Sequence, residues 1–357
     1  MPIRLAIGLL LLLFTAPAFS EESEIKTGIY TKVFQEQSPL SDLDRMVKIT
    51  RWPREKMAEY DIADHTFQLI VPKDYDGTKA YGLLVFIHPF SSINTDRFYG
   101  RVIPDVLAKH DLIWVSYNKA GNEVMPNIRL GLALDAVHNM SQRYNIDDKR
   151  VYVSGLSGGG RMTCMAGVYY PQVFTGALPI IGTLYFRDVK LPEDPELRAL
   201  IKPDPPKGVA VWPRGLLKPT NKTLARMKRE QRWVLIAGET DFNMPQMRAH
   251  FEQGFKRDGF EHVHYLEVEG MGHTYPDAEW FDRALTLLEQ DAELADAGEP
   301  ADERTERLAQ RRLEVALRTL ARDQSRGVRA LQRLIDDLPN TQAAKLAREQ
   351  LDGLEDE

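Results

Sequence analysis

The sequence predicts an α/β protein: a mostly parallel sheet covered by helices on both faces, followed by a C-terminal helical tail. Short apolar runs rich in β-branched residues alternate with stretches of helical period. A glycine-rich turn joins one such run to the next helical stretch. The last 76 residues contain no Phe, Trp, Tyr, His, Met or Cys, so the composition changes toward the C-terminus.

The overall composition is that of a globular protein and excludes several functional classes. The 357 residues include 46 Lys and Arg against 52 Asp and Glu, which gives a net charge of −6. Phosphate binding needs clustered positive charge, so no nucleic-acid partner is expected. The single cysteine, Cys164, excludes an internal disulfide framework and a multi-cysteine zinc site.

The first 20 residues predict a secretory signal peptide. Arg4 precedes an apolar run over residues 5–14, and an A-x-S ending at Ser20 stands before Glu21. The run is shorter than the roughly 20 apolar residues that span a bilayer, which disfavours a membrane anchor. We therefore expect cleavage before Glu21, a secreted or periplasmic product, and no stable membrane insertion after cleavage.

After an N-terminal extension, residues 21–64, the expected strands and helices alternate over residues 65–290. Residues 65–72 alternate apolar and polar side chains, as a half-buried strand does. Continuous apolar runs suit strands buried on both faces of a parallel sheet; they lie at 83–87, 112–116, 150–154 and 233–237, with a further strand expected at 266–270. Helices are expected over residues 128–140, 159–170 and 247–255.

A proline-rich insertion interrupts this alternation between two strands. Residues 183–231 contain seven prolines, a density that resists regular structure and predicts a long surface loop. Long insertions often serve as lids, so we expect the walls of a substrate pocket from residues 90–99 and from this insertion. Its aromatic residues either contact substrate or pack the insertion onto the sheet.

The tail begins after a predicted linker at residues 295–300. Residues 301–357 show apolar stripes of helical period, with breaks expected at Gly327 and at Pro339-Asn340. The part from 326 to 351 resembles one tetratricopeptide-type helical pair. Two interpretations are open: the tail packs on the main domain, or it binds a protein partner.

Residues 155–159 read Gly-Leu-Ser-Gly-Gly and match the motif G-x-S-x-G. A strand is predicted before them and a helix after them, the setting that holds a serine, here Ser157, on a sharp elbow with its hydroxyl exposed. Gly155 and Gly159 are needed there because side chains would collide with neighbouring backbone. The alternatives are a plain turn or an anion-binding loop at a helix N-terminus, although the lysine of a P-loop is absent and Arg161 is a poor substitute.

A serine hydroxyl acts as a nucleophile when an adjacent base, itself oriented by a carboxylate, takes its proton. Asp241 follows a predicted buried strand, and His273 lies on a glycine-rich loop after the last one. With Ser157, both fall at the carboxyl ends of strands, where open α/β sheets form their ligand crevice. The sequence therefore predicts a Ser157–His273–Asp241 triad, with Glu239 as the rival acid.

Acyl transfer also needs N–H groups aimed at the developing oxyanion. We expect one from Gly158 and another from the loop that follows residues 83–87 and begins His88-Pro89-Phe90. The strand, this His-Gly-like turn, the serine elbow, the acid loop and the terminal G-x-G-H loop together resemble the α/β-hydrolase superfamily. The resemblance covers residues 65–288.

Within that superfamily, residues 67–76, 143–152 and 270–273 are similar to secreted polyhydroxybutyrate-depolymerase and feruloyl-esterase-like enzymes. This resemblance implies that the Phe90 N–H is the second oxyanion donor. Pro89 stands where the family usually has glycine, and Phe90 stands where depolymerases often carry a cysteine. Proline has no N–H and fixes φ, so Pro89 alters the loop shape on which the Phe90 assignment depends. The missing cysteine argues against polymer hydrolysis.

The predicted activity is that of a secreted serine hydrolase that cleaves carboxylic esters, in small molecules or linked to a polymer, through an acyl-enzyme. No cofactor is expected, and no metal, because His262 and His264 lack an evident third ligand. One alternative is a prolyl-oligopeptidase-like peptidase, although residues 21–64 are too few for the propeller domain of such enzymes. The other is a non-catalytic adaptor that acts through the helical tail.

Overall fold

A computed structural model describes residues 26–91, 103–202, 209–297, 303–338 and 341–355. The predicted signal peptide, most of the expected pocket wall at 90–99 and the expected break at Pro339-Asn340 lie outside these residues. In the described part of the chain, no helix combines the length and apolar character needed to cross a bilayer.

One sheet of eight strands forms the centre of the fold, in the order β1-β2-β4-β3-β5-β6-β9-β10. The pairs β1–β2 and β2–β4 are antiparallel, and every other neighbouring pair is parallel. The strands are β1 (Gly28–Lys32), β2 (Phe67–Val71), β3 (Tyr81–Ile87), β4 (Leu112–Tyr117), β5 (Ile146–Leu156), β6 (Gly176–Ile180), β9 (Arg232–Gly238) and β10 (Val263–Val268). The predicted mostly parallel sheet is confirmed.

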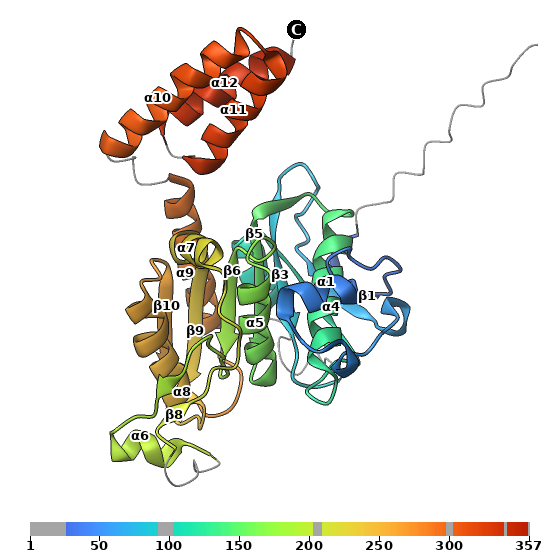
Figure 1. Cartoon of the computed structure of the whole chain (residues 1–357). Coiled ribbons are helices and arrows are strands. Elements are labelled where there is room, and N and C mark those ends of the chain that lie inside the picture. Colours follow the sequence, from blue (N-terminus) through green and yellow to red (C-terminus); the bar gives the residue numbers. More distant parts are fainter. Residues whose placement is uncertain (1–25, 92–102, 203–208, 298–302, 339–340, 356–357) are drawn as a thin grey trace, which may run out of the picture.

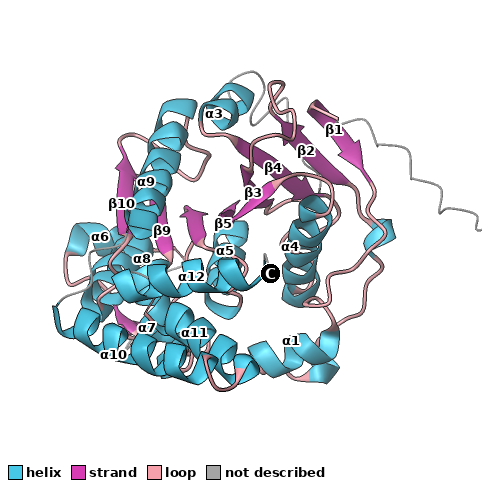
Figure 2. Ribbon diagram, turned by 90° about the horizontal axis from the view of Figure 1, so that it is seen from above, coloured by secondary structure: helices cyan, strands magenta, loops and turns pink. Residues whose placement is uncertain are grey.

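Helices cover both faces of the sheet because its central strands are apolar on both sides (Figure 2). All residues of β3, β4 and β9 are buried. Successive side chains of a strand point to opposite faces, so each strand supplies two cores. One core contains α4 (Pro126–Ser141), α5 (Gly158–Tyr169) and α8 (Met244–Ala249), and the other contains α3 (Ile103–Lys109) and α9 (Ala278–Ala297).

The N-terminal extension belongs to the sheet, which therefore begins before the expected residue 65. Strand β1 pairs with β2, and α1 (Leu43–Thr50) follows it. The buried carboxylate of Asp135 on α4 anchors this segment, because it accepts hydrogen bonds from Ser38 N (2.7 Å), Ser41 Oγ (2.6 Å) and Tyr60 Oη (2.5 Å). Burial raises the pKa of Asp135.

The proline-rich insertion is more regular than the sequence predicted. It forms a two-stranded ribbon, β7 (Val189–Lys190) with β8 (Val211–Trp212), and the helices α6 (Pro195–Leu200) and α7 (Asn221–Glu230). Proline is tolerated here because Pro195 lies in the first turn of α6, where no intrahelical N–H is needed. Helix α7 begins only after the last proline of the insertion.

Two helix boundaries also differ from the prediction. The helix expected at 247–255 begins at Met244 as α8 and continues as a π-helical turn, His250–Lys256. The linker expected at 295–300 begins later, because α9 extends to Ala297.

The tail forms α10 (Glu303–Leu320), α11 (Gln324–Asp337) and α12 (Gln342–Glu355), which lie beyond the end of α9 and away from the sheet (Figure 1). These helices bury a small core of their own, which consists of Ala309, Leu313, Ala316, Leu331, Leu334, Ala343 and Ala347. The sequence predicted a helix break at Gly327, but this residue lies inside α11. A Cβ on Gly327 would stand 2.2 Å from the Cα of Leu320, so glycine permits the close approach of α10 and α11.

Candidate active site

Ser157 lies at the sharp turn between β5 and α5. Its φ of 53° and ψ of −113° are unfavourable for a side chain with a Cβ, a strain that functional sites often retain. The turn is tight: a Cβ on Gly159 would stand 1.9 Å from the carbonyl oxygen of Ile87, and one on Gly155 would stand 2.6 Å from the same atom. Gly182, which the sequence analysis did not single out, is equally constrained, since its Cβ would stand 2.2 Å from the Ser157 carbonyl oxygen.

The structure brings the three residues of the predicted triad into one hydrogen-bonded chain. His273 Nε2 lies 2.9 Å from Ser157 Oγ, and His273 Nδ1 lies 2.9 Å from Asp241 Oδ2. Asp241 is 1% exposed, and its other oxygen accepts the Asn243 N–H at 2.6 Å. When Nδ1–H donates to the carboxylate, Nε2 is left as the acceptor for the serine proton.

The rival acid, Glu239, lies elsewhere in the same loop. Its carboxylate accepts the N–H of Gly270 at 2.8 Å on the exposed side of the turn. It therefore braces the loop that leads to His273, while Asp241 contacts the imidazole itself.

The strand order and the placement of these residues after β5, β9 and β10 identify the architecture. This is the α/β-hydrolase fold. The resemblance that the sequence motifs indicated is confirmed at the level of the fold. The predicted C-terminal helices are confirmed as well.

Comparison with known proteins adds one local similarity in sequence. No family model matches the chain. A 49-residue stretch is 51% identical to poly(3-hydroxyalkanoate) depolymerase C of Paucimonas lemoignei. That stretch covers 14% of this chain and 12% of the depolymerase, so most of each chain lies outside the match.

Several solved esterase and hydrolase structures are similar in fold. A ferulic acid esterase is 17% identical and covers 75% of this chain and 98% of its own, with a TM-score of 0.48. A thermostable esterase is 21% identical over 64% of this chain and 59% of its own, with a TM-score of 0.43. The S-formylglutathione hydrolase FrmB of Staphylococcus aureus is 15% identical over 74% of this chain and 97% of its own, with a TM-score of 0.44.

In this α/β-hydrolase fold, the N–H of Gly158 stands directly after the nucleophile at the start of α5, where helix N–H groups favour negative charge. The second predicted donor, the Phe90 N–H, donates to His88 Nδ1 at 3.2 Å. The Phe90 ring is 54% exposed on the loop after β3. The role of Phe90 as an oxyanion donor stays a prediction. It requires that the Phe90 N–H donate to the substrate oxygen in place of His88 Nδ1.

His88 is a buried residue of this loop that the sequence analysis named without assigning it a role. Because its Nδ1 accepts the Phe90 N–H, the proton resides on Nε2, which donates to Tyr275 Oη at 2.8 Å. Burial, aided by the charge of Arg129, lowers the pKa of His88 to about 4. The neutral imidazole thus connects the loop after β3 to the segment that follows His273.

Phe242, between Asp241 and Asn243, stacks on the imidazole of His273. The two ring centroids lie 4.3 Å apart at an interplanar angle of 23°. Phe242 is nevertheless 36% exposed, whereas the His273 side chain is 32% exposed. The sequence showed only an aromatic residue next to an acid, so this role required the structure.

The aromatic residues of the expected pocket walls, at 90–99 and in the insertion, differ in where the structure places them. Tyr185 and Phe186 are buried, and Tyr185 packs against Phe255 with ring centroids 4.9 Å apart, so they hold the insertion on the helical segment His250–Lys256. Trp212 is half-buried on β8. Phe98 and Tyr99 lie outside the described residues.

Other candidates from the sequence play no part in this arrangement. Cys164 is fully buried on α5, and burial raises the pKa of its thiol to about 12. Among the described residues, no group of three or more His, Cys, Asp or Glu side chains could hold a metal ion.

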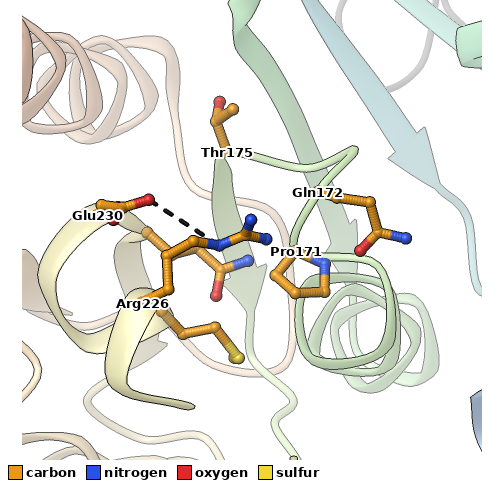
Figure 3. A pocket seen from close by; sticks show the side chains of 7 residues that line it. Pro171, Gln172, Thr175, Arg226 and Glu230 are labelled. Carbon is orange, nitrogen blue, oxygen red and sulfur yellow. Dashed lines mark ion pairs between the residues drawn. The ribbon is translucent and has the colours of Figure 1, made fainter. Parts of the chain in front are cut away.

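Figure 3 shows a small cavity lined by residues of α7 and of the segment before β6. Its lining includes Thr175 and an ion pair between Arg226 and Glu230, 3.9 Å apart. Thr175 stands just before β6, whereas the Ser157 N–H donates to Ile180 at the far end of β6. The cavity is therefore separate from the site around Ser157.

Proposed function

We propose that this protein is a serine hydrolase that cleaves carboxylic esters through an acyl-enzyme on Ser157. The observation that supports this most directly is the hydrogen-bonded chain from Ser157 Oγ through His273 to the buried Asp241 carboxylate. Ser157 lies on a strained elbow at the carboxyl end of β5, the position at which an α/β-hydrolase fold presents its nucleophile.

The proposed mechanism assigns each residue of the site a role in the two half-reactions of ester hydrolysis. His273 Nε2 takes the proton of Ser157 as Oγ attacks the ester carbonyl, and the N–H groups of Gly158 and Phe90 bind the oxyanion. The imidazolium then protonates the leaving alcohol. Water activated by His273 releases the acid in the second half-reaction, while Asp241 orients the ring and stabilises its charged form.

Exposed apolar side chains near the triad favour an ester with an apolar acyl group. Phe90, Met125 and Phe242 lie on the loops after β3, β4 and β9 and are each at least 36% exposed. The local identity to a poly(3-hydroxyalkanoate) depolymerase supports an ester rather than an amide as the scissile bond. We therefore place ester hydrolysis before the peptidase alternative.

A fluorophosphonate probe tests the nucleophile directly. We expect stoichiometric labelling of the mature protein, loss of labelling in Ser157→Ala, and retained labelling in the control Ser141→Ala, which alters an exposed serine at the end of α4. An unlabelled wild-type protein, or a Ser157→Ala variant that still labels, would rule the proposal out and favour the non-catalytic adaptor.

A substrate panel then separates esterase from peptidase. Acetyl, feruloyl and short hydroxyacyl esters are compared with peptide amides of matching acyl groups, with kcat/KM as the measure. We expect turnover of esters at least a hundredfold above that of the amides, because the alcohol leaves more easily than the amine. Faster cleavage of the amides would instead assign the site to a peptidase.

We also propose that the protein is exported. The support is the N-terminal sequence: Arg4, a short apolar run and an A-x-S ending before Glu21. Expression of the full chain followed by N-terminal sequencing of the exported fraction tests this, with Glu21 expected as the first residue. Recovery of the uncleaved chain in the cytoplasm would contradict it.

A further inference from the structure

Arg129 on α4 is a buried cation close to the candidate active site. It is 4% exposed. Its guanidinium donates to the carbonyl oxygens of His88 (2.9 Å) and Ala120 (3.1 Å) and to Asn122 Oδ1 (3.3 Å). All these acceptors are uncharged, and the Glu123 carboxylate only partly offsets the effect of burial, which lowers the pKa of Arg129. What sets Arg129 apart is which segments of the chain these hydrogen bonds join.

The acceptors of Arg129 belong to the two loops that surround Ser157. His88 begins the loop after β3, which holds the Phe90 N–H, while Ala120 and Asn122 lie on the loop after β4. The loops are also joined directly, because the Asn122 N–H donates to the carbonyl oxygen of Pro89 at 2.8 Å. One planar fork of donors thus holds both loops in a single arrangement.

The side chain of Asn122 extends this arrangement to the other side of the site. A Cβ built on Gly158 would stand 1.9 Å from Asn122 Oδ1, so the amide occupies the space next to Gly158 in which a side chain would lie. Arg129 therefore contacts both sides of the site: the Phe90 side through His88, and the Gly158 side through Asn122.

We propose that Arg129, with Asn122, is a positioning residue for the oxyanion hole: it fixes the Phe90 and Gly158 N–H groups relative to each other and places a positive charge behind them. This inference rests on the proposed serine hydrolase function. Preorganised donors and nearby positive charge matter most in the tetrahedral intermediate, where the ester oxygen becomes anionic. The contribution should therefore appear in kcat and in the binding of tetrahedral analogues, and much less in KM.

The test compares Arg129→Met, Arg129→Lys and Asn122→Ala in the mature protein with Arg232→Met as the matched control. Arg232 is also buried, and it donates to the Lys149 carbonyl oxygen (2.5 Å) and to Thr175 Oγ1 (2.8 Å) at the amino end of β9, far from Ser157. Active sites are counted by fluorophosphonate labelling to completion. We then measure kcat and KM on a soluble ester, and the Ki of an alkyl boronic acid.

We expect Arg129→Met to lower kcat per labelled site by about 100-fold with KM within about threefold, and to weaken boronic acid binding by a similar factor. Arg129→Lys, which keeps the charge but not the fork, should fall between this variant and wild type. Asn122→Ala should lose about 10-fold in kcat. Arg232→Met should keep kcat per labelled site even if its melting temperature falls.

A kcat for folded Arg129→Met within threefold of wild type would overturn the inference, as would an equal loss of kcat in Arg232→Met. If Arg129→Met does not fold, Asn122→Ala decides, because unchanged kcat and boronic acid affinity in that variant would refute the role of the bridge. Failure of the proposed function is a different result: the wild-type protein itself would not label at Ser157.

Discussion

The loops around Ser157 and the three C-terminal helices differ in how they use their side chains. Around Ser157 the backbone is strained, neighbouring glycines have no room for a Cβ, a cation is buried and aromatic rings are exposed. Apart from Gly327, helices α10–α12 follow ordinary rules instead: Ala and Leu form their core, and Asp323 caps α11 by accepting the N–H of Arg326. Departures from local preference gather where chemistry is proposed, as expected when function rather than stability selects them.

The largest expected effect on kcat comes from substitutions in the triad. Ser157→Ala or His273→Ala should lower kcat by on the order of 10⁴–10⁶, because each change abolishes nucleophilic attack. Asp241→Asn should lower kcat by on the order of 10⁴, since it disturbs the histidine tautomer. Glu239→Gln, which alters only the contact with Gly270, should stay within a few-fold of wild type. Steady-state kinetics on one soluble ester measures all four, and the reverse ranking of the two acids would contradict the geometry.

A smaller effect is expected for the ring that stacks on His273. Phe242→Leu keeps an apolar side chain but removes the π face that stabilises the imidazolium, so kcat should fall about 10-fold. Phe242→Tyr retains the stack and should remain near wild type. Kinetics together with thermal denaturation of both variants checks this; equal activity of the two would show that the stack is only a packing contact.

The effect of acid on the free energy of unfolding should also differ between the α/β part of the chain and the C-terminal helices. Burial lowers the pKa of His88 to about 4 and that of His250 to about 3, whereas the tail contains no histidine. In the unfolded chain these residues titrate near pH 6.5, so between that pH and about 4 the unfolded state binds more protons and stability falls as pH falls.

The unfolding free energy of the wild-type protein should fall between pH 7 and pH 5. In His250→Gln we expect this fall to be smaller by on the order of 2 kcal/mol. Urea denaturation of wild type and variant at both pH values measures the difference. A chain that ends at Ala297 should show the same pH dependence as the full chain. An unchanged pH dependence in His250→Gln would mean that this histidine is not held neutral by burial.

The smallest effect is expected from the tail itself. Ending the chain after Ala297 removes α10–α12, whose core is formed among themselves, and no candidate catalytic residue lies beyond that point. We expect kcat on a small soluble ester to stay within about threefold of wild type. A collapse of activity in folded, active-site-titrated truncated protein would instead show that the tail shapes the site, and the separation drawn between the two regions would be wrong.

Much of this structure could be read from local sequence. Continuous apolar runs predicted β3, β4 and β9, because strands buried on both faces need apolar side chains at every position. The serine motif, followed in chain order by an acid and a histidine at strand ends, singled out the three residues that the structure joins. The sequence analysis did not predict β1 or β6. It also misread the proline at the start of α6, and Gly327 where two helices meet closely.

What the sequence determined by itself was therefore most strands of the central sheet, the elbow at Ser157 and the separate composition of the tail. Only the tertiary structure showed that Asp241, and not Glu239, contacts His273, and that Arg129, Asn122 and His88 meet beside Gly158. The physical reason is that periodicity and turn chemistry act between neighbours in the chain. Contacts among loops are set instead by strand order, which brings the ends of β3, β4 and β5 to one edge of the sheet.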